Sequence, residues 1–153
     1  MEFNSDNIIL DAEISNQKEV LEKIASTAVN LGLANNAKKL TNDFLKREEE
    51  FSTGFGNGVA IPHAKTEAVT KASIIFLRLK DGIDWNSMDG KPVKLIIAII
   101  VPVEASKEHL NTLAKLSRKI IHQEFINRLT TEDKPKIIEL IQDTLNEGDI
   151  KYD

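Results

Sequence analysis

The sequence contains no cysteine. Disulfide bonds, metal sites built from thiolates and cysteine nucleophiles are therefore excluded. Histidine is also scarce, with three residues in a chain of 153. Acid–base or nucleophilic chemistry by imidazole near neutral pH must therefore use His63, His109 or His122.

Long apolar runs and clusters of basic residues are missing as well. The longest apolar stretch, residues 95–101, is far shorter than the roughly 20 residues that a membrane-spanning helix needs. The first 15 residues lack the basic start and the apolar core of a signal peptide. The formal net charge is −4 and the longest basic run is Lys38-Lys39, which argues against a nucleic-acid partner. We therefore expect a cytoplasmic protein that does not insert into a membrane.

The composition is that of an ordinary globular domain, because 41% of the residues are hydrophobic and 29% are charged. We expect one domain over residues 1–153. Aliphatic runs predict strands at residues 58–61, 72–79 and 93–101, after a short apolar run at 8–10. Helical spacing predicts a helix capped by Ser15 and others at about 36–48, from 106, at 123–129 and from about 135. Turn signals at residues 81–92 suggest a hairpin-like connection, so we expect a three-layer α/β sandwich with a mixed β-sheet flanked by helices on both faces.

The most informative stretch is STGFGNGVAIPHAK, residues 52–65. Its histidine, His63, directly follows Pro62, and the proline ring restricts how that side chain is presented. The glycines of the stretch allow close backbone approach and leave N–H groups available to an anion. An ordinary alternative is a flexible turn followed by a partly buried histidine with satisfied hydrogen bonds.

These parts are what a phosphohistidine site requires. A neutral imidazole attacks phosphorus through one ring nitrogen while an acceptor orients the other. Arg47, just before the stretch, supplies a planar fork of donors for phosphoryl oxygens. His109 follows another predicted strand, and the helix that begins near Ser106 adds backbone donors. His122 lies about 220° around that same helix and is expected to point elsewhere.

Two other kinds of chemistry fit the sequence less well. The GFGNG run matches neither a Walker A loop nor the glycine spacing of a dinucleotide fold, so nucleotide binding is unsupported. A metal-dependent hydrolase that uses His63 and His109 lacks a convincing third ligand such as an HExxH pair.

The stretch 52–65, together with Arg47-Glu48, resembles the active-site signature of the IIA domains of the bacterial phosphoenolpyruvate-dependent sugar phosphotransferase system, fructose/mannitol type. Residues 84–93 and 101–110 resemble the same family, and the likeness extends over about residues 5–147. The resemblance implies that His63 is phosphorylated, that Arg47 lies over the phosphate and that His109 assists. It implies no metal and no organic cofactor. We assign Thr53, Gly54, Asn57 and Ser106 to the surroundings of the phosphoryl group.

The resemblance also implies a phosphotransferase with defined partners. Phosphate would arrive from the phosphocarrier protein HPr, which enzyme I charges from phosphoenolpyruvate. It would leave for a IIB domain, which phosphorylates the sugar as a membrane IIC permease imports it. The stretch 84–93 is more similar to the fructose transport members, which favours uptake of fructose or a related sugar. The alternative is a nitrogen-type regulatory IIA phosphoprotein that acts by binding partners.

Overall fold

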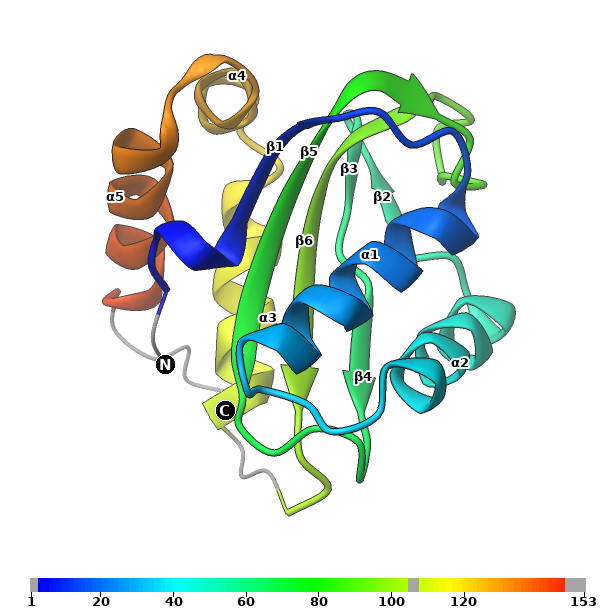
Figure 1. Ribbon diagram of the computed structural model, residues 1–153. Coiled ribbons are helices and arrows are strands. Elements are labelled where there is room, and N and C mark those ends of the chain that lie inside the picture. The colour runs from blue at the N-terminus through cyan, green and yellow to red at the C-terminus, as the bar shows by residue number, and fades with distance from the viewer. Residues whose placement is uncertain (1–2, 105–107, 148–153) are drawn as a thin grey trace, which may run out of the picture.

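The computed structural model describes residues 3–104 and 108–147, and it contains a six-stranded sheet with helices on both faces (Figure 1). A short 3-10 helix, η1 (Ser5–Asn7), precedes the first strand. The strands are β1 (Ile8–Ala12), β2 (Gly54–Gly56), β3 (Val59–Ala60), β4 (His63–Lys65), β5 (Ser73–Ile83) and β6 (Val93–Val101). The helices are η1 (Ser5–Asn7), α1 (Gln17–Asn30), α2 (Ala37–Glu50), α3 (Glu108–Lys119), α4 (Gln123–Thr131) and α5 (Lys134–Leu145).

The sheet is mixed, as the hairpin-like connection predicted. Its strand order is β1-β5-β6-β3-β2, and β4 also pairs with β6. The long strands β5 and β6 form an antiparallel pair at the centre. Parallel pairing joins β1 to β5 and both β3 and β4 to β6, whereas β2 pairs antiparallel with β3. The expected mixed sheet is therefore confirmed.

Alternate side chains of the central strands pack into two separate cores, one on each face of the sheet. Side chains of Ile75 and Leu77 on β5 pack with those of α1 and α2. Their neighbours Ile74 and Phe76 pack with those of α3, α4 and α5. Because successive side chains of a strand point to opposite faces, an almost wholly apolar strand needs a covering layer on each side. The three-layer α/β sandwich is confirmed.

The helices begin where short polar side chains can cap them. Asn16 accepts a hydrogen bond of 2.9 Å from the backbone of Glu19, so the cap of α1 is Asn16 and the prediction of Ser15 was wrong by one residue. Asn36 caps α2 in the same way, through the backbone of Lys39 at 3.0 Å. Pro135 lies in the first turn of α5, where its missing N–H costs no helical hydrogen bond.

Two short strands were not predicted. β2 contains two glycines and β4 comes directly after a proline, so neither has the local composition of a strand. Pairing with β3 and β6 stabilises them, and this pairing depends on residues distant in sequence. The turn-like residues Asp81 and Gly82 also belong to a strand, because β5 continues to Ile83 and pairs there with Val93.

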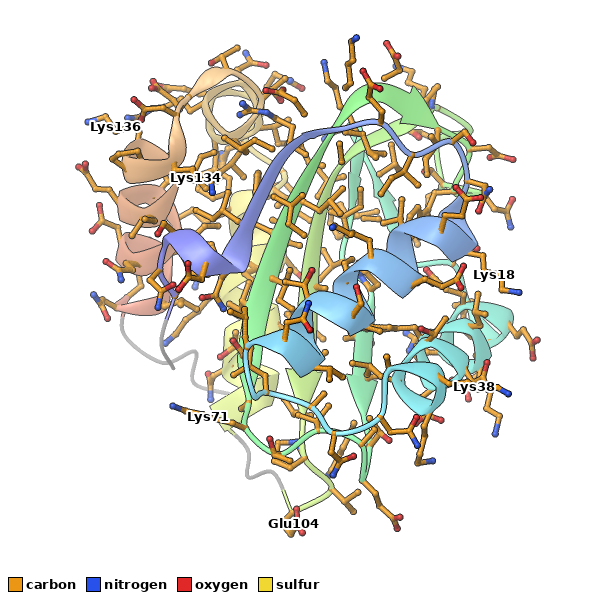
Figure 2. The ribbon with its side chains drawn as sticks, viewed as in Figure 1. Lys18, Lys38, Lys71, Glu104, Lys134 and Lys136 are labelled. Carbon is orange, nitrogen blue, oxygen red and sulfur yellow. The ribbon has the colours of Figure 1, made fainter. Side chains whose placement is uncertain are left out.

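The positive charges that Figure 2 labels are distributed over both helical layers. Lys18 and Lys38 project from α1 and α2, whereas Lys134 and Lys136 lie on α5 across the sheet. None of the described helices is both long enough and apolar enough to cross a membrane.

Candidate functional site

His63 directly follows a break between two short strands that both pair with β6. β3 and β4 pair in succession with the same strand, Val59 opposite Leu95 and His63 opposite Ile99. Between them Pro62 has no N–H to donate, although its carbonyl oxygen accepts from the N–H of Ile99 at 3.0 Å. His63 therefore follows a strand, as predicted, but it also begins another one.

The hydrogen bonds of the His63 ring fix its tautomer. The Nδ1 atom lies 2.9 Å from the carbonyl oxygen of Ile61, which can only accept, so Nδ1 carries the proton. The Nε–H of Arg47 donates to Nε2 at 3.1 Å, so Nε2 must supply a lone pair. The ring is thus a neutral imidazole whose Nε2 carries the lone pair.

Burial lowers the pKa of His63 below its ordinary value of 6.5, and the positive charge of Arg47 lowers it further. The hydrogen bond to Ile61 and the carboxylate of Glu48 act in the opposite direction without reversing the shift. The imidazole is therefore neutral at neutral pH, which is the form that can attack phosphorus.

The lowered pKa gives a pH dependence with a defined sign. Below pH 6.5, the ordinary histidine value, the unfolded chain binds a proton at His63 that the folded chain does not bind. The free energy of unfolding should therefore decrease as the pH falls from about 6.5 towards the folded pKa of His63. Denaturant unfolding over a pH series should show this decrease in the wild type, and His63→Gln should lack that part of it. An imidazole NMR titration of His63 with a midpoint at or above 6.5 would contradict the account.

Arg47 reaches the ring from the last turn of α2, which lies beside β4 (Figure 1). Its Nη1 atom donates to the carbonyl oxygen of Phe51 at 3.0 Å, so the guanidinium group is held at two points. Arg47, predicted to lie over the phosphate, contacts His63 in the structure, and its role towards a phosphoryl group stays a prediction. Further N–H groups of this planar side chain are suited to phosphoryl oxygens.

Glu48, the neighbour of Arg47, anchors the start of the glycine stretch. Its carboxylate accepts from the backbone N–H of Thr53 at 3.2 and 3.0 Å and from the hydroxyl of the same residue. The indole Nε1–H of Trp85 also donates to it, at 2.7 Å. Sequence reasoning assigned no role to Glu48, although the Arg-Glu pair was part of the resemblance. Trp85, the only tryptophan of the chain, is buried and anchors a loop.

The residues predicted to surround the phosphate donate their backbone N–H groups to other groups of the protein. Thr53 N–H donates to Glu48, Gly54 N–H donates to the hydroxyl of Ser52 at 3.0 Å, and Asn57 N–H donates to Asp89 at 3.0 Å. These backbone donors are therefore occupied in the free protein. A direct contact of Thr53, Gly54 or Asn57 with a phosphoryl group stays a prediction.

The glycines shape the hairpin between β2 and β3. Gly56 and Gly58 have φ angles of 113° and 80°, in the region that favours glycine, and Asn57 between them has φ of 56°. The Asp89 carboxylate receives the Asn57 N–H at this turn, and N–H donation from Lys91 and Asn57 lowers the pKa of Asp89.

Gly54 is required for a different reason, the close approach of the chain at Ser87. A Cβ atom at Gly54 would lie 2.6 Å from Oγ and 2.9 Å from Cα of Ser87. Ser87 Oγ is itself buried and has no hydrogen-bond partner among the described residues. Only glycine therefore fits at position 54 without a shift of the backbone.

We expect Gly54→Ala to lower the free energy of unfolding by about 1–3 kcal/mol, as overpacking does elsewhere. Urea unfolding measures this loss. The same substitution in a Ser87→Gly background should cost less, because Oγ and Cβ of Ser87, which would lie 2.6 and 3.1 Å away, are absent there. A Gly54→Ala chain as stable as the wild type would contradict the packing described.

The structure does not describe the side chains of two predicted site residues. Ser106 lies outside the described residues. His109 is the second residue of α3, but its side chain is outside the described part of the structure. Their roles therefore stay predictions. The prediction that His122 belongs to the same helix as His109 was wrong, because α3 ends at Lys119 and His122 is the exposed N-cap residue of α4.

The part of the chain that the structure describes holds no group of three or more His, Asp or Glu side chains that could bind a metal ion. The site consists of His63 and Arg47, supported by the Ile61 carbonyl oxygen and by the Glu48 carboxylate.

Comparison with known proteins adds independent findings. Residues 1–144 match the family model described as phosphoenolpyruvate-dependent sugar phosphotransferase system, EIIA 2. A relative from Haloferax volcanii named PTS system fructose-specific EIIA component is 35% identical over 140 residues, which is 92% of this chain and 89% of the relative. The Escherichia coli PTS system fructose-like EIIA component is 35% identical over 127 residues, 83% of this chain and 86% of the relative.

Two solved structures of IIA proteins are similar in fold to this chain. The nitrogen regulatory protein IIA-Ntr from Neisseria meningitidis matches with a TM-score of 0.83 and 30% identity, over 89% of this chain and 93% of that one. The Escherichia coli IIA mannitol enzyme, solved in complex with phosphorylated IIB mannitol enzyme, matches with a TM-score of 0.78 and 21% identity over 93% of this chain and 98% of that one. At that identity the second likeness concerns the fold alone.

Proposed function

Because this chain belongs to the EIIA 2 family of the phosphoenolpyruvate-dependent sugar phosphotransferase system, we propose that it carries a phosphoryl group on Nε2 of His63. The observation that supports this most strongly is the pair of hydrogen bonds on the ring. Ile61 holds the Nδ1 proton, and Arg47 lies 3.1 Å from the nucleophilic nitrogen. His122, the other histidine whose side chain the structure describes, has neither contact.

The transfer is a displacement at phosphorus. The Nε2 lone pair forms a bond to phosphorus while the bond from phosphorus to the donor's leaving atom breaks, and the electron pair of that bond stays with the donor. His63 keeps its Nδ1 proton, so the phosphorylated ring is positively charged, and the Ile61 carbonyl oxygen stabilises this charge. In the next transfer the electron pair of the P–N bond returns to Nε2, and the ring is neutral again.

Arg47 changes partner during this step. Its Nε–H donates to the Nε2 lone pair in the free protein, and that lone pair is consumed when the P–N bond forms. The guanidinium group then donates to the phosphoryl oxygens, where charge is concentrated. We assign to His109 the assisting role that the family resemblance implies.

The donor that we propose is phospho-HPr, and the acceptor is the IIB domain of a fructose or fructose-like permease. The names of the two relatives above support the choice of sugar. A structure of a similar fold in complex with a phosphorylated IIB enzyme supports the choice of acceptor class.

The test is reconstitution with enzyme I, HPr and labelled phosphoenolpyruvate. We expect label on the chain that is acid-labile and alkali-stable, depends on HPr and is lost to an added fructose-type IIB domain. No label in the complete mixture, or equal label without HPr, would overturn the proposal.

A regulatory role is the second candidate, and the likeness to the IIA-Ntr structure at 30% identity favours it. In that case the phosphorylated chain would keep its label in the presence of fructose-type IIB domains. Rapid loss of the label to such a domain, within the mixing time of the assay, would instead support sugar transport.

A further inference from the structure

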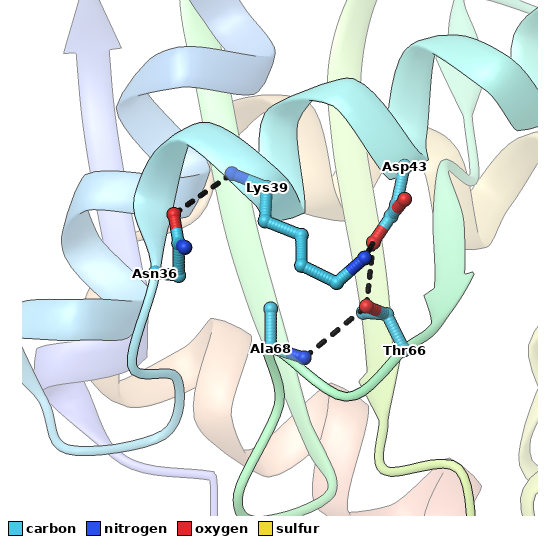
Figure 3. Close-up of polar contacts among 5 residues, drawn as sticks. All are labelled: Asn36, Lys39, Asp43, Thr66 and Ala68. Carbon is cyan, nitrogen blue, oxygen red and sulfur yellow. Dashed lines mark hydrogen bonds and ion pairs between the residues drawn. The ribbon is translucent and has the colours of Figure 1, made fainter.

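We propose that Asp43 and Thr66 are positioning residues that keep Arg47 beside His63 during phosphoryl transfer. The hydroxyl of Thr66 donates to Oδ2 of Asp43 at 2.5 Å, joining helix α2 to the segment that follows β4 (Figure 3). This inference rests on the proposed transfer at His63 and adds residues to which no catalytic contact is assigned.

The position of this contact couples it to the site. Asp43 and Arg47 are four residues apart on α2, so they lie on the same face of the helix about 6 Å apart along its axis. Thr66 comes three residues after His63. The same face of α2 therefore contacts the strand region twice, at Arg47–His63 and at Asp43–Thr66.

Thr66 is a firm anchor for the helix. Its side chain is buried, its N–H donates to the carbonyl oxygen of Val101 at 3.0 Å, and its hydroxyl accepts from the N–H of Ala68 at 3.2 Å. The bond to Val101 fixes it to the end of the central strand β6. The hydroxyl proton is therefore free to be donated to Asp43, and Figure 3 marks this hydrogen bond with a dashed line.

Asp43 is also oriented from its own helix. Nζ of Lys39 lies 3.5 Å from the same Oδ2 atom that receives the Thr66 hydroxyl. Asn36 caps the backbone of Lys39, so the first turn that carries this lysine is ordered as well (Figure 3). A partly exposed ion pair adds little stability by itself. The Thr66 hydrogen bond is therefore the contact that fixes the position of the helix.

The need for a second contact follows from the chemistry at Nε2. Within the described residues, Arg47–His63 and Asp43–Thr66 are the two side-chain hydrogen bonds between α2 and residues 63–68. Phosphorylation of Nε2 removes the first of them, because its lone pair becomes the P–N bond. The Asp43–Thr66 bond remains and keeps the guanidinium group within reach of the phosphoryl oxygens.

Two substitutions break the contact in different ways. Thr66→Val removes the hydroxyl with little change of shape, and Asp43→Ala removes the acceptor while the Thr66 hydroxyl still receives the Ala68 N–H. We expect each to slow phosphoryl uptake from saturating phospho-HPr by about 10–100-fold, the cost of a small misplacement of a catalytic group. The HPr concentration for half-maximal rate should change less than twofold. Thr66→Ser should restore the rate, and the double variant should be no slower than the single ones.

The chain offers matched controls for these variants. Thr70→Val removes a hydroxyl of the same loop that donates to the carbonyl oxygen of Gly32 at 3.0 Å, away from α2. Lys39→Ala removes the ion pair and leaves the Thr66 contact in place. Both controls should transfer within about threefold of the wild-type rate, and thermal unfolding checks that every variant is folded.

An NMR titration of His63 in the unphosphorylated chain gives a readout independent of transfer. Arg47 and Glu48 are the charged groups that act on this ring, and Arg47 lowers its pKa. Displacement of Arg47 in Thr66→Val or Asp43→Ala should therefore raise the midpoint above the wild-type value, and Thr70→Val should not. Wild-type rates and an unchanged midpoint in both variants would overturn the positioning role. A wild-type chain that takes no label would instead overturn the proposed function, and the titration would still report on the positioning of Arg47.

Discussion

A chain with His63→Gln takes up no phosphoryl group from phospho-HPr, and this is the largest effect that we expect from any substitution. The glutamine amide can accept the Arg47 N–H through its oxygen but has no nucleophilic nitrogen. Other functional groups cannot replace a missing nucleophile, so the loss should be complete to the background of the assay.

The measurement is the amount of acid-labile label per chain after incubation with enzyme I, HPr and labelled phosphoenolpyruvate. His122→Gln is the matched control, because this exposed histidine lies at the start of α4 on the far helical layer and its side chain makes no capping hydrogen bond. It should label like the wild type. Thermal unfolding of His63→Gln should stay close to that of the wild type, since the ring is only partly buried. Full labelling of a folded His63→Gln chain would show that His63 is not the carrier.

Replacement of Arg47 should have the second largest effect. Arg47→Lys keeps the positive charge but loses the planar fork, which donates to Nε2 and to the Phe51 carbonyl oxygen together. We expect the rate of phosphoryl uptake at saturating phospho-HPr to fall about 10²–10³-fold, the range seen when one preorganised donor to a developing charge is removed. Arg47→Gln, which also removes the charge, should be at least as slow.

Rapid-quench measurement of label against time gives these rates. Lys46→Gln removes an exposed positive charge from the adjacent position of α2 and should transfer within about threefold of the wild type. The His63 titration adds a second test, because loss of the Arg47 charge in Arg47→Gln should raise the pKa of the ring. An Arg47→Gln chain with the wild-type rate would contradict the contact on which the site is built.

The residues that we propose to take part in the transfer could be found from the sequence because they lie in short motifs. His63 stands out because histidine is scarce in the chain and because a proline precedes it. Arg47 stands out because it lies just ahead of the glycine stretch. The central strands β5 and β6 were equally visible, since a nearly continuous aliphatic run needs burial on both faces. These signals are local, so a single sequence carries them.

The residues that hold the reacting groups were not visible in the same way. The Ile61 carbonyl oxygen reaches Nδ1 of His63 because the chain breaks between β3 and β4. This break depends on tertiary pairing with β6. Glu48 meets Trp85 across 37 positions of the chain, and Asp43 meets Thr66 across 23. Such contacts are set by tertiary packing and leave no periodic pattern in the sequence. The short strands β2 and β4 were missed for the same reason.

The central claim is that Nε2 of His63 carries the phosphoryl group while Nδ1 keeps its proton. It is tested most directly by imidazole nitrogen NMR of the chain labelled with ¹⁵N-histidine, phosphorylated through enzyme I and HPr. The expected result is one phosphorylated histidine, His63, with phosphorus coupled to Nε2 and with a protonated Nδ1 hydrogen-bonded to the Ile61 carbonyl oxygen. Phosphorus on Nδ1 of His63, or on His109 or His122 in place of His63, would contradict the account.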